Sequence, residues 1–134
     1  MTQATAMLDT YPAEVGMDKG LLARCIEATV QCAQACTACA DACLSEPDVT
    51  DLVRCIRENL DCADICDVTG RVLSRHTGDN TAMTLAMLQA CVAACRSCGD
   101  ECARHAEHHE HCRVCADQCR RCEDTCQQLL NSLG

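Results

Sequence analysis

The sequence predicts an all-α protein, an antiparallel up-down-up-down four-helix bundle preceded by a short N-terminal helical segment. Three observations predict this fold. Four long stretches are rich in Ala, Leu, Glu, Gln and Arg, which favour helices. Cysteines recur within these stretches at steps of 3, 4 or 7 residues, the spacing of one helix face. The connections between the stretches are short, which makes neighbouring helices antiparallel.

One domain is expected over residues 1–134, because a chain of this length supports a single core. The N-terminal segment ends in a break from Pro12 to Asp18, and later breaks also contain Pro or Gly. Asp18, Asp48 and Asn80 stand at helix starts, where such side chains cap free backbone N–H groups. The long helices are therefore expected at approximately 18–44, 48–76, 80–103 and 105–132.

Each long helix carries its cysteines on one narrow face. At about 100° per residue, the cysteines of a helix fall within a stripe of roughly 40° to 80°, narrower than the apolar face of an ordinary amphipathic helix. The arginines lie well off these stripes, so the stripes are expected to face inward. The predicted core therefore holds all 17 cysteines: Cys25, Cys32, Cys36, Cys39, Cys43, Cys55, Cys62, Cys66, Cys91, Cys95, Cys98, Cys102, Cys112, Cys115, Cys119, Cys122 and Cys126.

Sulfur takes the place of aromatic side chains in this chain. It has 17 cysteines and one tyrosine, with neither phenylalanine nor tryptophan. A free cysteine packs as a small hydrophobe, but thiols oxidise and fill space poorly, so packing alone does not explain four aligned stripes. The N-terminus lacks the basic and apolar regions of an export signal. We therefore expect a cytoplasmic protein, in which many cysteines indicate metal binding or catalysis.

Charge and hydropathy disfavour two classes of partner. The formal net charge of −9 disfavours nucleic acid, which is bound through basic patches. No stretch is expected to reach the length and apolarity of a membrane span, so no membrane partner is expected.

A disulfide framework is a weaker interpretation of the cysteines. Cβ atoms four residues apart on a helix stand about 5 to 6 Å apart, beyond the roughly 4.5 Å that a disulfide tolerates. The odd number of cysteines also leaves at least one thiol unpaired. Bridges between helices stay open, so a thiol-based redox role is an alternative.

The spacing C-x-x-x-C suits a soft metal ion held by two or three thiolates. Thiolates select Cu(I), zinc or iron–sulfur clusters. Several zinc sites with four thiolates each would place excess negative charge in a narrow core, whereas Cu(I) bridged by thiolates gives an almost neutral one. The loop run that commonly ligates iron–sulfur clusters is absent from the sequence. The residues favour many Cu(I) ions per chain, with zinc, another soft metal or an iron–sulfur cluster as alternatives.

The two ends of the predicted bundle differ. The end opposite the middle connection carries a histidine-rich segment, and with a fourth helix starting near His105, His108 projects onto the cysteine stripe. His105 and His109 flank it, so these three histidines are predicted to pass copper inward. A solvated polar loop is the alternative. Toward the middle connection, the cysteines give way to a predicted apolar plug of Leu21, Leu22, Leu73, Met83, Met87, Leu88, Leu129 and Leu130.

The cysteine stripes, the H-x-x-H-H-x-H-C segment at 105–112 and the apolar end resemble the cysteine-rich four-helix-bundle copper storage proteins, in particular the cytosolic members without an export signal. The resemblance implies storage of many Cu(I) ions along the bundle axis, loading through the open end, and assembly as a homotetramer. It maps the cysteines to ligands and the three histidines to the mouth. The second long helix departs from the pattern, because Thr69 and Leu73 stand where its stripe continues.

The expected function is a copper store that serves copper homeostasis or detoxification without catalysis. A copper chaperone or a small-thiol donor is the expected source of the metal. An enzyme that uses a cysteine needs an exposed thiol of lowered pKa, whereas nearly all of these cysteines are expected to face inward.

Overall fold

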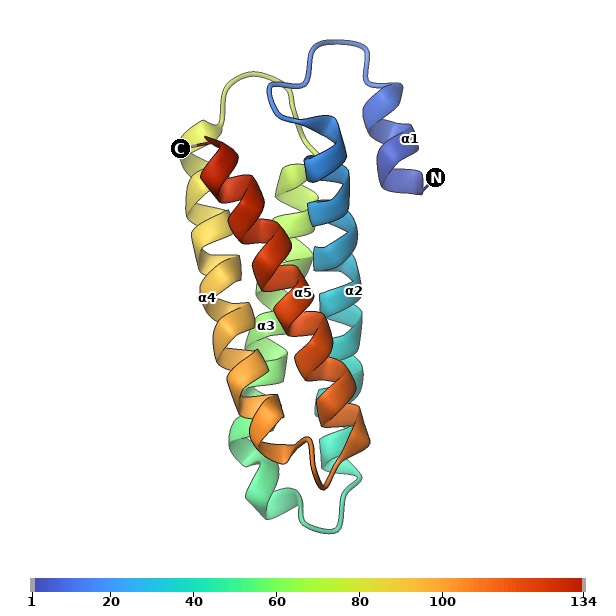
Figure 1. Ribbon diagram of the computed structural model, residues 1–134, viewed down its shortest axis with the longest axis vertical. Coiled ribbons are helices and arrows are strands. Elements are labelled where there is room, and N and C mark those ends of the chain that lie inside the picture. Colours follow the sequence, from blue (N-terminus) through green and yellow to red (C-terminus); the bar gives the residue numbers. More distant parts are fainter. Residues whose placement is uncertain (1, 134) are drawn as a thin grey trace.

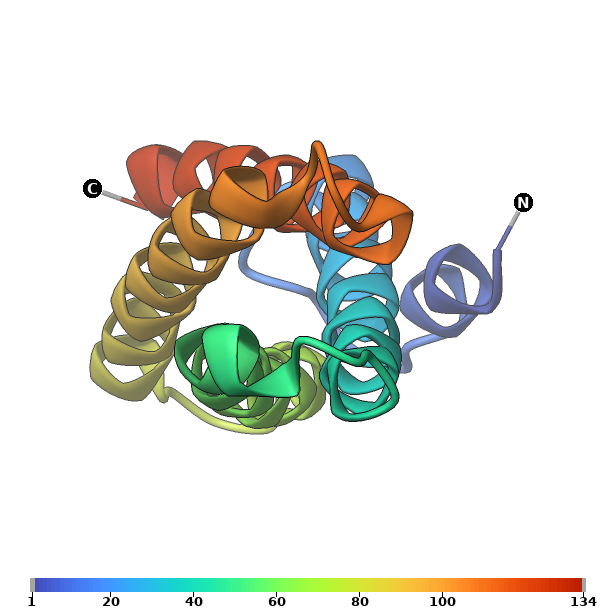
Figure 2. The same cartoon turned by 90° about the horizontal axis from the view of Figure 1, so that it is seen from below.

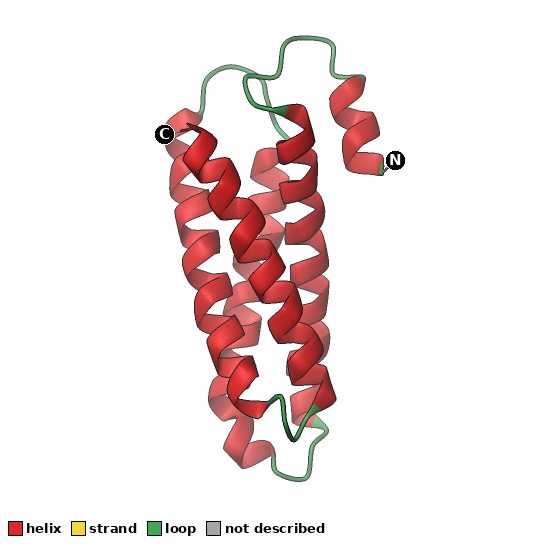
Figure 3. Ribbon diagram, viewed as in Figure 1, coloured by secondary structure: helices red, strands yellow, loops and turns green. Residues whose placement is uncertain are grey.

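The computed structural model describes residues 2–133, in which four long helices form a bundle and a short helix lies along its side (Figure 1). Within this range Figure 3 shows helices and loops and no strand. The predicted all-α bundle with a short N-terminal helix is confirmed. The elements in chain order are α1 (Gln3–Asp9), α2 (Lys19–Leu44), the 3-10 helix η1 (Val49–Leu52), α3 (Val53–Leu73), α4 (Thr81–His105) and α5 (Glu110–Leu133).

The four long helices surround a common axis, and each contacts two others. Both α2 and α4 contact α3 and α5, while α1 contacts α2 from outside the bundle (Figure 2). The α2–α3 and α4–α5 connections, residues 45–52 and 106–109, lie together at one end, which we call the mouth (Figure 1). The α3–α4 connection, residues 74–80, lies at the other end, which we call the plug end.

The predicted bounds of the second, third and fourth long helices differ from those in the structure. α4 continues to His105 and α5 begins only at Glu110, so no helix starts at residue 105. The intervening turn contains His109, whose ring nitrogens lie 2.6 Å from a carboxylate oxygen of Glu46 and 3.0 Å from one of Asp48. These contacts with the other mouth connection hold the turn, and sequence periodicity does not reveal them. The second long helix likewise begins as the 3-10 turn η1 and ends at residue 73 rather than 76.

The predicted helix caps are confirmed only in part. Asp18 caps α2 as predicted, because its carboxylate accepts a hydrogen bond of 2.8 Å from the N–H of Leu21. Asn80 precedes α4 without a side-chain cap, and Asp79 instead accepts from the N–H of Thr81 at 3.0 Å. Gly78, just before, has φ of 74°, a left-handed conformation that favours glycine.

Leucines close the plug end. Leu22, Leu73, Leu88 and Leu129 come from the four long helices and are at most 1% exposed. The predicted contribution of Met83 to this plug is wrong, because its side chain is 49% exposed on the outside of α4. The interior at this end is therefore aliphatic, and the thiols begin beyond it.

α4 has 25 residues and includes an 18-residue window with a mean hydropathy of 1.2, so the expectation that no stretch reaches the length and apolarity of a membrane span is wrong. The core helix of a soluble bundle meets the same limits. The buried face of α4 consists largely of cysteines with Leu88, and the helix packs against α3 and α5.

Gly70 allows α3 to approach α2 closely, and this gives a test of the packing. A Cβ at this position would lie 2.8 Å from Oγ1 of Thr29, a fully buried side chain. We expect Gly70→Ala to lower the free energy of unfolding by about 1–3 kcal/mol, because overpacking outweighs a gain of about 1 kcal/mol in helix propensity. Urea denaturation of the reduced, copper-free protein measures the change.

The matched control is the same substitution in a Thr29→Ala background. Removal of the obstructing hydroxyl should cancel most of the penalty. An equal loss of stability in both backgrounds would contradict the steric explanation.

Candidate metal centre

All 17 cysteines are free thiols, and each is at most 2% exposed. They extend along the bundle axis from the plug leucines to the mouth, and we call their Sγ atoms the sulfur column. Every cysteine thus lies inside the bundle, as the spacing of the cysteines predicts.

Thiols four residues apart on one helix stand at a spacing that suits a bridging metal ion. Their Sγ atoms are 3.8 to 4.0 Å apart, at Cys32–Cys36, Cys62–Cys66, Cys98–Cys102 and Cys122–Cys126. A disulfide requires about 2.05 Å between the sulfurs. Two thiolates on opposite sides of a metal at about 2.3 Å stand up to roughly 4.6 Å apart. Small side-chain rotations therefore convert each pair into a clamp for one ion.

Contacts between helices join these pairs into one column. Cys66 lies 3.6 Å from Cys95 across the α3–α4 interface, and Cys36 lies 3.7 Å from Cys119 across the α2–α5 interface. Ligand atoms within 4.8 Å of one another form several groups that share members, among them Cys32/Cys66/Cys95/Cys122, Cys32/Cys36/Cys62/Cys119, Cys36/Cys98/Cys115/Cys119, Cys39/Cys55/Cys102 and Cys39/Cys43/His111/Cys112. Shared thiols are the arrangement that bridging thiolates require.

Asn59 is a buried amide within the sulfur column, on the stripe of α3. Its Oδ1 accepts hydrogen bonds from the thiols of Cys115 at 2.9 Å and Cys98 at 3.3 Å. Its Nδ2 donates to the backbone carbonyl of Cys55 at 2.8 Å, which fixes the amide orientation. A carboxamide oxygen is therefore aimed at the thiols. An amide that replaces cysteine on a stripe is the sequence signal for this donor.

Only one of the mouth histidines touches a thiol within residues 2–133, and it was not among the three predicted site residues. Nδ1 of His111 lies 3.4 Å from Sγ of Cys39 and 3.7 Å from Sγ of Cys112. In the sequence, the indication of this contact was the position of His111 next to Cys112, the first cysteine of the fourth stripe. The wrong helix start obscured it, because extending the helical periodicity back to residue 105 placed His108 on the cysteine stripe.

The three predicted histidines have different surroundings. His105 bonds to Glu101, with 2.9 Å between Nε2 and a carboxylate oxygen. His108 is exposed in the turn before α5, so its predicted projection onto the cysteine stripe does not hold. His109 has a carboxylate at each ring nitrogen, and its hydrogen bond to Asp48 is the main cause that raises its pKa. Both ring nitrogens thus face carboxylates, and a nitrogen that donates a hydrogen bond to a carboxylate has no free lone pair for a metal.

Burial opposes ionisation of the thiols in the copper-free protein, and their neighbours shift individual pKa values in either direction. Burial, followed by the charge of Cys112, raises the pKa of Cys43 to about 11. Hydrogen bonds from Cys39 and Cys55 instead lower the pKa of Cys112, which adjoins His111. A thiol must lose its proton to bind a metal ion, so metal binding by these buried thiols is coupled to proton release.

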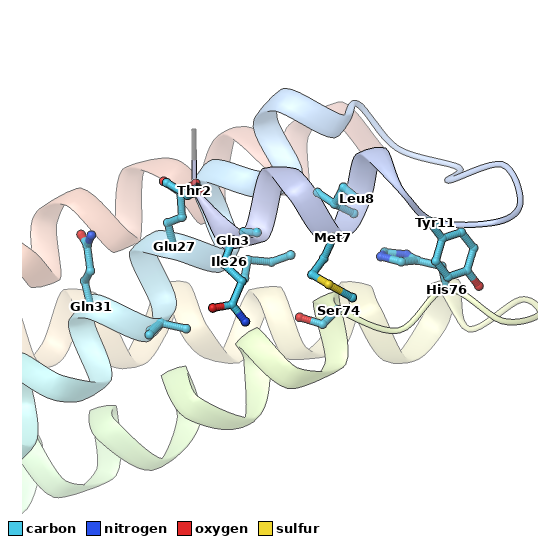
Figure 4. A pocket seen from close by; sticks show the side chains of 12 residues that line it. Thr2, Gln3, Met7, Leu8, Tyr11, Ile26, Glu27, Gln31, Ser74 and His76 are labelled. Carbon is cyan, nitrogen blue, oxygen red and sulfur yellow. Dashed lines mark hydrogen bonds between the residues drawn. The ribbon is translucent and has the colours of Figure 1, made fainter.

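A surface pocket of about 620 Å³ lies elsewhere, between α1 and the plug-end half of the bundle (Figure 4). Its lining includes Met7, Ile26 and His76, and its residues include no cysteine. The ring of Tyr11 packs edge-on against His76, with 5.3 Å between the ring centroids. This pocket is separate from the metal chemistry of the axis.

Comparisons with known proteins agree with this arrangement. A family profile described as copper storage protein matches residues 18–131. A Streptomyces lividans copper storage protein, Ccsp, solved with 10 copper equivalents, is 60% identical over 97% of this chain and 99% of its own, with a TM-score of 0.96. A cytosolic copper storage protein from the same organism, solved with five coppers, is 64% identical over 86% of this chain and 96% of its own, with a TM-score of 0.85.

The cysteine-rich protein YhjQ of Bacillus subtilis (strain 168) is more distant. It is 33% identical over 105 residues, which cover 78% of this chain and 92% of that protein. The similarity thus extends over most of both chains.

The closed plug end predicts an order of thiol reactivity. In the reduced, copper-free protein, we expect iodoacetamide to label all cysteines much more slowly than in urea, because none is more than 2% exposed. Cys112, at the mouth and with a lowered pKa, should react before Cys25 and Cys126, which lie next to the buried leucines. Mass spectrometry of timed samples gives the order. Earlier labelling of the plug-end pair would contradict the assignment of the open end.

Proposed function

The chain belongs to the copper storage protein family, and from this premise we propose that it binds many Cu(I) ions on the sulfur column and holds them in reserve. The observation that carries the proposal is the sharing of thiols between adjacent four-ligand groups along the axis. Isolated metal sites need no shared ligands. A continuous column with shared ligands supports a polynuclear store.

The proposed ligand set consists of the 17 cysteines with two other donors. Asn59 supplies an amide oxygen in the middle of the column, where α3 has no cysteine. His111 supplies Nδ1 at the mouth. The other three histidines of the mouth are not assigned as ligands of the column: His105, His108 and His109.

Charge balance supports Cu(I) over divalent ions. Each Cu(I) that displaces one thiol proton leaves the net charge of the core unchanged. A zinc ion bound by four thiolates leaves two excess negative charges, which repel those of neighbouring sites at low dielectric. Soft thiolate ligands also select Cu(I) on chemical grounds. Filling the column with Cu(I) therefore costs little electrostatic energy.

The cellular role follows from the family and from the relatives. We propose a cytoplasmic, non-enzymatic store that buffers copper and protects against its toxicity, supplied by a copper chaperone or a small thiol. The burial of every thiol supports storage over thiol catalysis, which needs an exposed, activated cysteine. Assembly as a homotetramer is part of the proposal and rests on family resemblance.

An anaerobic titration tests the proposal. Reduced protein is titrated with Cu(I) in the presence of a competing chelator, and free chelator complex is monitored by absorbance. We expect saturation at or above the 10 copper equivalents carried by the Streptomyces lividans protein. Zinc in a parallel titration should saturate at far fewer ions. Saturation with one or two Cu(I) ions would contradict storage and favour a chaperone or sensor.

The route of uptake is tested with two histidine variants. His111→Ala should slow copper loading by about tenfold, in the range for loss of a metal-site interaction, with most of the capacity retained. His108→Ala is the matched control, because its side chain is exposed in the adjacent turn, and it should load at the wild-type rate. Stopped-flow transfer from a Cu(I)–chelator complex measures both. Equal rates for the two variants would contradict uptake through His111.

A further inference from the structure

A glutamate in the α2–η1 connection contacts the two inner histidines of the mouth. One carboxylate oxygen of Glu46 lies 2.9 Å from Nε2 of His111 and 2.6 Å from Nδ1 of His109. Asp48, two residues further on, contacts His109 but has no contact with His111 in the described chain. The two carboxylates thus differ in their relation to the thiols, since only Glu46 reaches the histidine that touches them.

The contact decides which nitrogen of His111 carries the proton. A carboxylate only accepts hydrogen bonds, and a neutral imidazole has a single N–H. Donation from Nε2 to Glu46 leaves the lone pair on Nδ1, which faces Cys39 at 3.4 Å and Cys112 at 3.7 Å. In the other tautomer, Nδ1 carries a proton and cannot bind a metal cation.

We propose that Glu46 is a positioning residue that holds His111 in the tautomer and ring orientation that accept incoming Cu(I) at Nδ1. Metal-binding histidines usually donate their other ring N–H to such a partner, which orients the ring and makes it a stronger ligand. The inference rests on the proposed uptake of copper through His111. It adds a residue that touches neither thiol nor copper.

The two histidines that contact Glu46 have different surroundings. His109 has carboxylates at both ring nitrogens and is 9% exposed in its side chain. His111 has a carboxylate at one nitrogen and thiols at the other. His109 therefore contacts only carboxylates among these groups, whereas His111 links Glu46 to the sulfur column.

The test compares three variants of the full chain: Glu46→Ala, Glu46→Gln and Asp48→Ala. We expect Glu46→Ala to slow stopped-flow Cu(I) loading about tenfold, within the range for loss of a partner of a metal ligand. Glu46→Gln should restore much of the rate, because its amide oxygen still accepts from Nε2. Asp48→Ala is the matched control and should load within twofold of wild type. Capacity measured by titration should stay unchanged in all three.

A second readout reports the tautomer without copper. Long-range ¹H–¹⁵N spectra of the copper-free protein distinguish protonated from unprotonated ring nitrogens. We expect His111 to carry its proton on Nε2 in wild type and Glu46→Gln, and to populate both tautomers in Glu46→Ala. Circular dichroism melts of the variants exclude unfolding as the cause of slow loading.

The outcomes separate this inference from the uptake route. Wild-type loading by Glu46→Ala overturns the role of Glu46, as does an unchanged tautomer, while slow loading by His111→Ala still supports uptake at the mouth. Lost capacity in Glu46→Ala would make Glu46 a ligand and also overturn the positioning role. Wild-type loading by His111→Ala overturns the uptake route itself.

Discussion

Contact between sulfur atoms of all four long helices at one axis is the constraint on which the rest of the bundle depends. Sγ atoms of different helices approach to 3.6–3.7 Å at Cys66–Cys95 and Cys36–Cys119. Leucine or phenylalanine at these positions would push the helices apart and break the column. This explains the absence of phenylalanine and tryptophan from the sequence, and the glycine at position 70, where α3 meets Thr29.

Because its core consists of thiols, the bundle can fold without metal and can also bind monovalent metal ions without a change in core charge. Protonated thiols are small and nearly apolar, so the empty bundle can fold around them as it would around alanine or valine. Exchange of each proton for a monovalent cation leaves the net charge of the core unchanged. The stability of the bundle and the chemistry of the store therefore use the same side chains without a conflict between them. Zinc fingers, which need their ion to fold, represent the opposite solution.

The sequence was sufficient for the fold and the cysteine positions because steps of 3, 4 and 7 residues encode a helix face directly. It was insufficient at the mouth. The turn before α5 is held by His109 with Glu46 and Asp48, residues more than sixty positions away along the chain. Such contacts leave no periodic signal, so the helix start was misplaced and His108 was preferred to His111. The prediction for Met83 was wrong because Thr84, the next residue, takes the inward position on α4. Met83 therefore lies on the outside of the helix.

The two ends of the sulfur column differ in their surroundings. At the plug end, Cys25 and Cys126 have Sγ atoms only 3.1 Å apart, next to a layer of buried leucines. In the proposed uptake from the mouth, an ion that reaches this pair passes the thiols between it and the mouth. Because neighbouring groups share thiols within 4.8 Å, a new sulfur can bind before the previous one is released. In the proposed uptake from the mouth, an ion would keep a sulfur ligand at each step and would not meet the apolar core as a bare ion.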